Sequence, residues 1–333
     1  MKKTILAAAL LASAFTAGTA GTAGAADWKP AKPVEFVVTS GAGGGTDNFA
    51  RTIQAIVTKH KLVAQPIVVV NKGGGNGAEG YVYSASAAGD PYKLTFGTNN
   101  QYLLPYVAKL GYKASDFAPV ATMALDEFLI WVNGESPLKD TKAYVEAAKK
   151  PDGLRMGGSQ SKDTDQTLVS LISQATGAKF TYIPFKSGGE AAVQLAGAHI
   201  DSNVNNPNEN IGQWKAGMVR PLCVFSPARM EAGPKVAQGM GWSDIPTCKE
   251  TGIAIDSYRM PRTVWLPAGA PPDAVAFYAD LLKKVSATPE WKEYIERTSQ
   301  SNAFMAGEDM IKFVKQDETR AVEVFKAENW IVQ

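Results

Sequence analysis

Short apolar runs alternate with helical patterns along most of this chain, and glycine-rich corners join many of them. Four runs in the first part have the length and composition of strands, namely "VEFVV", "PIVVV", "KLTFGT" and "FLIWV". Between the first two lies "TDNFARTIQAIVTKH", whose apolar residues recur at helical spacing. Further strand patterns follow in "LRMGGS", "FTYIPF", "IDSNVNN", "VRPLCVF" and "TVWLP". This alternation predicts an α/β protein with mostly parallel sheets flanked by helices.

The length of the chain favours two domains, because about 300 residues exceed the size at which a single core usually stops growing. We expect the chain to cross between the halves twice, near Phe128 to Val132 and near Tyr258 to Trp265. Residues 27–127 and 257–333 would then form domain 1, and residues 128–256 would form domain 2. A cleft is expected between the two domains.

Residues 1–26 have the layout of a secretory signal peptide. Lys2 and Lys3 precede an apolar run from Ile5 to Phe15, and small residues follow it. That run is far shorter than the roughly 20 residues that a membrane-spanning helix needs. We therefore expect cleavage and export, with an uncleaved membrane anchor as the alternative.

The charge balance gives no support to a nucleic acid or an anionic membrane as a partner. The chain has 34 basic and 32 acidic residues, and removal of Lys2 and Lys3 with the signal peptide leaves 32 of each. The two histidines, His60 and His199, lie far apart in the sequence, and the cysteine spacing fits no metal-binding pattern. We expect neither a metal site nor a cofactor.

The two cysteines, Cys223 and Cys248, are expected to form a disulfide. An oxidising compartment permits them to pair. Their surroundings, "RPLCVFS" and "IPTCKETG", resemble a strand and the start of a short helix, which can lie side by side.

The first glycine-rich corner, "TSGAGGGTD", follows a predicted strand and opens a predicted helix. It lacks the lysine of a P-loop, so a nucleoside triphosphate is not expected. The next corner contains Gly73-x-Gly75-x-x-Ala78, but no acidic residue stands where a dinucleotide ribose would be held. Unpaired backbone N–H groups at a helix start instead suit a carboxylate or a phosphate.

Several corners of this kind occur in the chain. Residues 71–80, 157–167 and 185–194 each follow a strand pattern and open a helical one. In open α/β sheets, ligands bind outside the carboxyl ends of the strands. Two halves whose corners face each other would surround a small anion, whereas the alternative is that the glycines only form tight turns.

Five segments together resemble one known family of proteins: "KPVEFVVTSGAGGGTDNFAR", "VVNKGGGNGAEGYVYSASAAGDPYKLTFGTNNQ", "GYKASDFAPVA", "YIPFKSGGEAAVQLAGAHIDSNVNN" and "VWLPAGAPPDAV". This family is the extracytoplasmic solute receptors of tripartite tricarboxylate transporters, also called the Bug (Bordetella uptake gene) family. The resemblance implies a periplasmic, two-domain Venus-flytrap receptor. It would deliver an organic carboxylate to the permease subunits of the transporter.

The resemblance also implies a set of ligand-binding residues. In this family the first loop and loops of the second domain grip a ligand carboxylate. By position, these loops correspond here to residues 39–46, 159–165 and 186–189. The resulting candidates are Thr39, Ser40, Gly43, Gly44, Thr46, Ser159, Ser161, Thr164, Lys186, Gly188 and Asn205.

The chain departs from the family pattern at three places. Residues 39–42 lack the aromatic ring and prolines of many relatives, which predicts a roomier and more polar pocket. Asn205 and Asn206 stand where many relatives have an aspartate, which removes a charge that would repel an anion. Arg259 and Arg262 lie by the second crossing. Arg262 is a candidate second anchor for a ligand carboxylate, with a surface ion pair as the alternative for either arginine.

The sequence therefore predicts a monomeric periplasmic binding protein for an organic carboxylate. A receptor for an amino acid or phosphate, or a sensory partner of a signalling protein, is the alternative. An enzyme is not expected, because neither histidine has the context of a nucleophilic site, although the numerous acidic residues leave a carboxylate-pair hydrolase open. The identity of the carboxylate is not encoded in these patterns, because gripping by backbone groups is common to many ligands.

Overall fold

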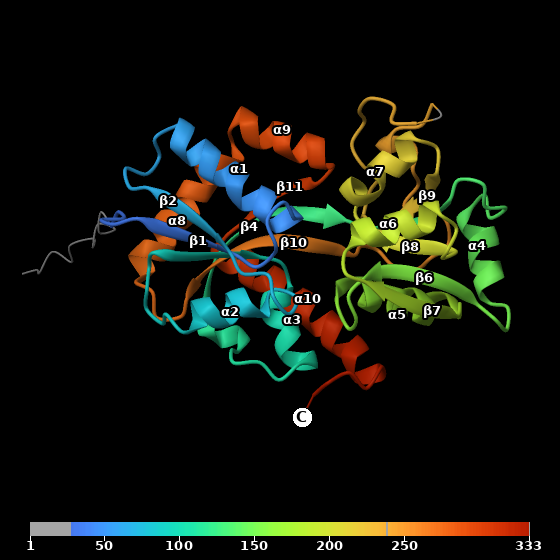
Figure 1. Cartoon of the computed structure of the whole chain (residues 1–333), viewed down its shortest axis with the longest axis horizontal. Helices are drawn as coiled ribbons and strands as arrows, with labels where there is room; N and C mark the ends of the chain where they lie inside the picture. Colours follow the sequence, from blue (N-terminus) through green and yellow to red (C-terminus); the bar gives the residue numbers. More distant parts are fainter. Residues whose placement is uncertain (1–27, 238, 333) are drawn as a thin grey trace, which may run out of the picture.

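The computed structural model of the chain describes residues 28–237 and 239–332. The predicted signal peptide, residues 1–26, lies outside the described residues. Two sheets with helices on both faces lie side by side, and the long helix α10 (Gly307–Ala327) runs below the first sheet and reaches α5 (Thr164–Thr176) of the second half (Figure 1).

The first sheet has six strands in the order β11-β4-β10-β3-β1-β2. These strands are β1 (Val34–Val38), β2 (Ile67–Asn71), β3 (Lys93–Gly97), β4 (Phe117–Glu127), β10 (Arg259–Pro267) and β11 (Ser301–Met305). Its remaining helices are α1 (Gly45–Lys59), α2 (Ala78–Ala85), α3 (Asn100–Val107), α8 (Pro272–Ser286) and α9 (Pro289–Thr298), with a 3-10 turn at Ala114–Asp116.

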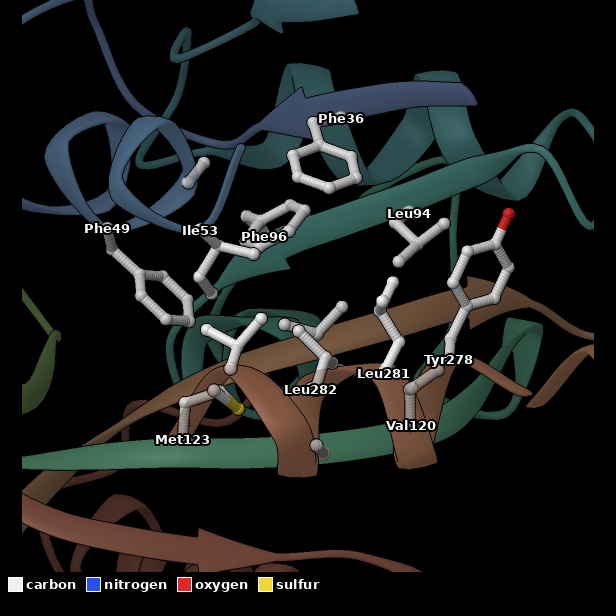
Figure 2. Close-up of a cluster of buried hydrophobic side chains, with 14 of the residues drawn as sticks. Phe36, Phe49, Ile53, Leu94, Phe96, Val120, Met123, Tyr278, Leu281 and Leu282 are labelled. Carbon is white, nitrogen blue, oxygen red and sulfur yellow. The ribbon is translucent and has the colours of Figure 1, made fainter. Parts of the chain in front are cut away.

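The core of this half lies between the sheet and helices α1, α8 and α9. Phe49 and Ile53 are four residues apart on α1, so they occupy one face of the helix, and both are fully buried. Figure 2 shows Phe49 and Ile53 in one cluster with Phe96 of β3. Leu281 and Leu282 of α8 belong to the same cluster. A second cluster, between the opposite face of the sheet and helices α2, α3 and α10, covers the rest.

The second sheet has five strands in the order β7-β6-β8-β5-β9. These strands are β5 (Leu129–Asn133), β6 (Leu154–Ser159), β7 (Phe180–Phe185), β8 (Ser202–Asn205) and β9 (Val219–Val224). Its helices are α4 (Thr141–Ala148), α5 (Thr164–Thr176), α6 (Gly188–Ala196) and α7 (Pro207–Lys215), with a 3-10 turn at Trp242–Asp244. Helices α4 and α5 cover one face, and α6 and α7 cover the other.

Both sheets are mixed, which corrects the expectation of mostly parallel sheets. Strand β1 runs parallel to β2 and β3, but β10 is antiparallel to both β3 and β4. The reason is the path of the chain. Strand β4 runs toward the second sheet, and β10 runs back from it after the chain returns. These two neighbouring strands are therefore antiparallel.

The chain passes between the sheets at Phe128, which separates β4 from β5, and again in the segment that precedes β10. At this junction Arg259 of β10 pairs with Glu127, the last residue of β4. The domain boundaries expected from the sequence stay a prediction.

The structure pairs Cys223 with Cys248 in a disulfide, the pairing predicted from the sequence. Cys223 lies on β9, and Cys248 lies in the long segment that follows this strand. Both are fully buried, so the bond fastens that segment to the edge of the second sheet.

Within the described residues, none of the helices combines the length and the apolar character needed to cross a bilayer.

Candidate functional site

The corner between β1 and α1 is closed by Asp47. Gly43 has a φ of +79°, in the left-handed region that favours glycine, and its N–H donates to Asp47 Oδ2 at 2.8 Å. Asp47 Oδ1 also accepts from Asn71 Nδ2 at 2.8 Å. These hydrogen bonds and the one from Arg51 outweigh the effect of burial and hold the pKa of Asp47 below its ordinary value. Asp47 therefore supports the corner from within.

The first turn of α1 presents free N–H groups. Gly44 occupies the N-cap position, and no side-chain acceptor caps the helix there. Within the part of the chain that the structure describes, the N–H groups of Gly45, Thr46 and Asp47 have no hydrogen-bond acceptor. The helix dipole adds partial positive charge at this end. The start of α1 is therefore suited to a carboxylate.

The two hydroxyl residues before the glycines differ in accessibility. Thr39 is buried, and its Oγ1 donates to the carbonyl of Phe96 at 3.0 Å, inside the sheet. Ser40 is partly exposed, and its Oγ makes only a local hydrogen bond of 3.2 Å to the carbonyl of Gly41. Of these two candidates, Ser40 is the one whose side chain lies at the surface of the corner.

Arg262 lies beneath the start of α1. It is 5% exposed, its Nη2 forms an ion pair with Asp126, and its Nη1 donates to Thr46 Oγ1 at 3.1 Å. A Cβ atom added at Gly45 would lie 2.8 Å from Nη2, so glycine is required for this close approach. Since both terminal nitrogens are engaged inside the protein, a direct contact between Arg262 and a ligand stays a prediction.

Arg259, the other arginine of this strand, belongs to the junction between the sheets. Its Nε donates to Ser257 Oγ at 3.2 Å, and its Nη1 lies 3.8 Å from Glu127 Oε1. It is thus held in an ion pair, which was the alternative for this residue.

The corners of the second half converge at the carboxyl ends of its strands. Gln160 Nε2 donates to the carbonyl of Lys186 at 3.0 Å, which joins the corners that open α5 and α6. Asn205 Nδ2 donates to the carbonyl of Gly188 at 2.7 Å, which joins the end of β8 to the start of α6. The N–H of Ser159 is already used by a carboxylate within this half, Asp165, at 2.7 Å.

Unlike α1, helices α5 and α6 are capped by their own side chains. Asp163 Oδ1 accepts from the N–H of Thr164 at 2.7 Å, and Ser187 Oγ accepts from the N–H of Glu190 at 3.2 Å. The predicted residues Ser161 and Lys186 are exposed beside these caps. The start of α1 therefore has more N–H groups free of a side-chain cap for an anion than the starts of α5 and α6 have.

The two halves are in direct contact where α5 meets α3. Thr164 Oγ1 donates to Asn99 Oδ1 at 3.0 Å, and both residues are buried. Asn99 Nδ2 in turn donates to Asp317 Oδ2 on α10 at 3.2 Å. The hydroxyl of Tyr258, at the second crossing, donates to the carbonyl of Thr164 at 2.8 Å. Thr164, a predicted ligand residue, thus also links the halves.

Three carboxyl groups of the second half have raised pKa values: Asp163, Asp165 and Glu209. Burial raises the pKa of Asp163 and raises that of Asp165 well above its ordinary value, with the nearby charge of Glu209 adding to the latter shift. Burial likewise raises the pKa of Glu209 to about 7, although the N–H of Asn206 partly opposes this. Within the described residues none of the three belongs to an ion pair of 4 Å or less.

Sequence reasoning did not select Asn99, Asp126, Asp163 or Glu209. Two of them carried a local signal. Asn99 comes directly after the predicted strand "KLTFGT", and Glu209 stands three residues after Asn206, which is the spacing of a capping box. The proximity of these residues to the other half depends on tertiary structure, so no local pattern shows it.

Two surface hollows lie away from the corners, on α10 and at the second crossing. Their volumes are about 440 Å³ and about 260 Å³. The first is lined by Lys312, Lys315, Gln316, Thr319, Arg320 and Glu323, and the second by Ser257, Arg259, Phe313, Gln316, Asp317 and Arg320. Neither contains any of the predicted ligand residues. The described residues contain no group of three or more His, Cys, Asp or Glu side chains that could hold a metal ion.

Comparison with known proteins gives a consistent result. A family model described as "Tripartite tricarboxylate transporter family receptor" matches residues 49–330. The "UPF0065 protein in gbd 5'region" of Cupriavidus necator is 28% identical over 310 residues, which are 91% of this chain and 88% of that protein.

Two solved structures are also similar to the chain. A TctC solute binding protein from Polaromonas, solved with no ligand, is 26% identical with a TM-score of 0.72, covering 90% of this chain and 99% of that one. The R. palustris protein Rpa4515, solved with adipate, is 25% identical with a TM-score of 0.76, covering 90% of this chain and 98% of that one.

Proposed function

This chain belongs to the tripartite tricarboxylate transporter receptor family, as the resemblance in its sequence predicted, and on that premise we propose that it captures an organic carboxylate between its two halves. The captured molecule is passed on unchanged to the permease subunits of a tripartite transporter. The chain binds and releases its ligand and catalyses no reaction on it.

The observation that carries this proposal is the uncapped start of α1. Three successive N–H groups, those of Gly45, Thr46 and Asp47, lack acceptors within the described part of the chain. The glycines before them leave the approach free, since a Cβ atom at Gly41 or Gly43 would meet no other atom within 4 Å. A ligand carboxylate bound there would complete the first turn of the helix.

The place of action that we propose is the periplasm. The layout of residues 1–26 supports export, and a receptor of this family works outside the cytoplasmic membrane. We propose that the protein acts as a monomer, since one chain contains both halves that would enclose the ligand.

The first prediction tests the start of α1 with the substitution Gly44→Asp. Gly44 has φ −72° and ψ 169°, an extended conformation that any residue can adopt, but a Cβ atom there would lie 3.2 Å from the carbonyl oxygen of Gly41, so the loop must shift slightly. An aspartate there would cap α1 with its own carboxylate and compete with the ligand. The cap should offset this crowding, so we expect the free energy of unfolding to change by only about a few tenths of a kcal/mol. Carboxylate affinity should fall by at least about tenfold.

Thermal unfolding without ligand, followed by a screen of succinate, adipate, citrate and benzoate, measures both effects in the wild type and the variant. A bound ligand raises the melting temperature by mass action. Gly233→Ala is the control variant, because Gly233 lies in the segment after β9, its φ is outside the left-handed region, and a Cβ atom there would meet no other atom within 4 Å. If Gly44→Asp binds carboxylates as tightly as the wild type, the start of α1 is not the site.

A further inference from the structure

The second half contains three carboxyl groups, Asp163, Asp165 and Glu209, that could contact a part of the ligand not bound at the start of α1. Asp163 and Glu209 are partly exposed, whereas Asp165 is buried. None of the three forms an ion pair within the described residues. Asp163 Oδ1 accepts from the N–H and the hydroxyl of Thr164. Glu209 Oε2 accepts from the N–H of Asn206 at 3.2 Å, and Glu209 Oε1 has no donor among the described residues.

Glu209 lies on the side of the second half that faces α1. Its carboxylate is close enough to Arg262 and Asp126 for their charges to affect its pKa in opposite directions. Arg262 contacts Thr46 in the first turn of α1. Asn206, the N-cap residue of the helix that carries Glu209, donates from Nδ2 to the carbonyl of Glu127 at 2.8 Å, and the neighbouring Asp126 pairs with Arg262. Glu209 and the start of α1 therefore lie at the same part of the junction between the halves.

The surroundings of Glu209 hold its carboxylate in place. A Cβ atom added at Gly188 would overlap the carboxylate of Glu209, so the glycine is needed for this position. Asn205 also contacts Gly188, and it is fully buried. Its Nδ2 has two acceptors, Gly188 and Asn210, but its Oδ1 has no donor among the described residues. Glu209 Oε1 and Asn205 Oδ1 are thus two acceptor oxygens without a donor among the described residues.

Among the described residues, no lysine or arginine side chain donates a hydrogen bond to Glu209 Oε1 or Asn205 Oδ1. Arg262 is engaged by Asp126 and Thr46. Lys162 and Lys186 belong to neighbouring corners but are exposed, and neither pairs with the three carboxyl groups. A positively charged group would stabilise the ionised form of Glu209, whereas a second negative charge on the ligand would be repelled by that form.

We propose that the ligand is an amino carboxylate, with its carboxylate at the start of α1 and an ammonium group bound by Glu209. Asn205 Oδ1 accepts a second hydrogen bond from the same ammonium group. The inference rests on the proposed function and adds the chemical class of the ligand.

The test compares probes that differ only at one end. Each dicarboxylate is paired with the amino carboxylate of similar length: succinate with γ-aminobutyrate, glutarate with δ-aminovalerate, and adipate with ε-aminocaproate. Calorimetry measures binding of all six to the wild type, Glu209→Gln and Glu190→Gln. Glutamine preserves the capping arrangement at both positions. Glu190 is a matched control, because it stands at the third position of α6 as Glu209 does in α7, but is exposed.

The wild type should bind at least one amino carboxylate more tightly than its dicarboxylate partner. Glu209→Gln should weaken that amino carboxylate by about ten- to a hundredfold, since a charge-assisted hydrogen bond is lost, and should leave dicarboxylates unchanged or tighter. Glu190→Gln should bind like the wild type. Melting temperatures without ligand confirm that both variants fold.

Two results overturn the inference in different ways. If dicarboxylates bind more tightly than every amino carboxylate, or Glu209→Gln does not change the preference, the ammonium assignment is wrong while the carboxylate receptor stands. If no probe of either class binds to the wild type, the proposed function itself is wrong.

Discussion

Arg262, a predicted ligand residue, forms a buried ion pair within the protein. From the sequence it was a candidate to hold a second carboxylate, and the structure gives it a carboxylate from the protein, Asp126. Both side chains are almost fully buried, at 7% and 2% exposure. A charge in such a position depends on its partner, because removal of one member leaves the other unpaired away from water.

The second prediction is that Arg262→Met destabilises the protein by about 3–5 kcal/mol. The double variant Arg262→Met/Asp126→Leu should recover much of this loss, because no unpaired charge remains. Denaturant unfolding of the three proteins measures the differences. If the single variant is as stable as the wild type and instead loses affinity only for dicarboxylates, Arg262 is the second ligand anchor that the sequence suggested.

Glu127, the last residue of β4, is a buried acidic residue at the junction between the sheets. It is 2% exposed, its Oε2 has no hydrogen-bond partner among the described residues, and burial raises its pKa to about 7 despite Ser301 and Arg259. In the unfolded chain a glutamate titrates near pH 4.3. Between these values the folded state binds more protons than the unfolded state, so the free energy of unfolding falls as the pH rises from about 5 to 7.

The third prediction follows from this sign. Glu127→Gln should remove the contribution of Glu127 to the pH dependence, so that the stability of the variant relative to the wild type increases by about 2 kcal/mol between pH 5 and pH 8. Urea unfolding at a series of pH values checks it. Glu209 contributes a slope of the same sign, so the variant should keep part of the dependence. Parallel curves for the two proteins would contradict the assignment.

At the scale of elements, the sequence predicted what is set locally. The patterns "VEFVV", "LRMGGS" and "FTYIPF" coincide with β1, β6 and β7. Strands β4 and β11 and helix α9 were not identified. In β4 all residues from Val120 to Glu127 are buried, so it lacks the alternation of a half-exposed strand. Strand pairing also depends on contacts distant in sequence, which is why the mixed sheets were not predicted.

The corners of the candidate site were predictable in position but not in role. Glycines after a strand mark the place where a helix begins, and all four predicted corners do open helices. Whether the first N–H groups of each helix are free depends on whether a neighbouring side chain accepts a hydrogen bond from them. Asp163 and Ser187 cap α5 and α6, whereas nothing caps α1. Asp47, in the first turn of α1, accepts from the N–H of Gly43 and so fastens the loop.

At the scale of the whole molecule, the halves are fastened on the side of α3, α5 and α10. Thr164 contacts Asn99 and accepts from Tyr258, and Arg320 of α10 donates to the carbonyl of Ser257 at 2.7 Å. Leu171 of α5 packs against the cluster formed by α3 and α10. No hydrogen bond within the described residues joins the Gly41–Gly45 loop to the second half.

The fourth prediction concerns the hydrogen bond between Thr164 and Asn99. Thr164→Val keeps the shape of the side chain but removes the hydroxyl, which leaves the buried Asn99 Oδ1 without its donor. The conformation in which α5 of the second half contacts α3 of the first half should become less populated. Since a ligand held by both halves requires that arrangement, its affinity should fall by about three- to tenfold for every ligand alike.

Small-angle scattering and calorimetry check this prediction together. Without ligand, the radius of gyration of Thr164→Val should exceed that of the wild type, and a saturating ligand should remove the difference. Thr176→Val is the matched control, because Thr176 lies on the same helix but its hydroxyl donates to the carbonyl of Ile172 within that helix. An affinity loss confined to one ligand would mean that Thr164 contacts the ligand itself. Unchanged scattering and affinity would mean that this contact does not control the relation between the halves.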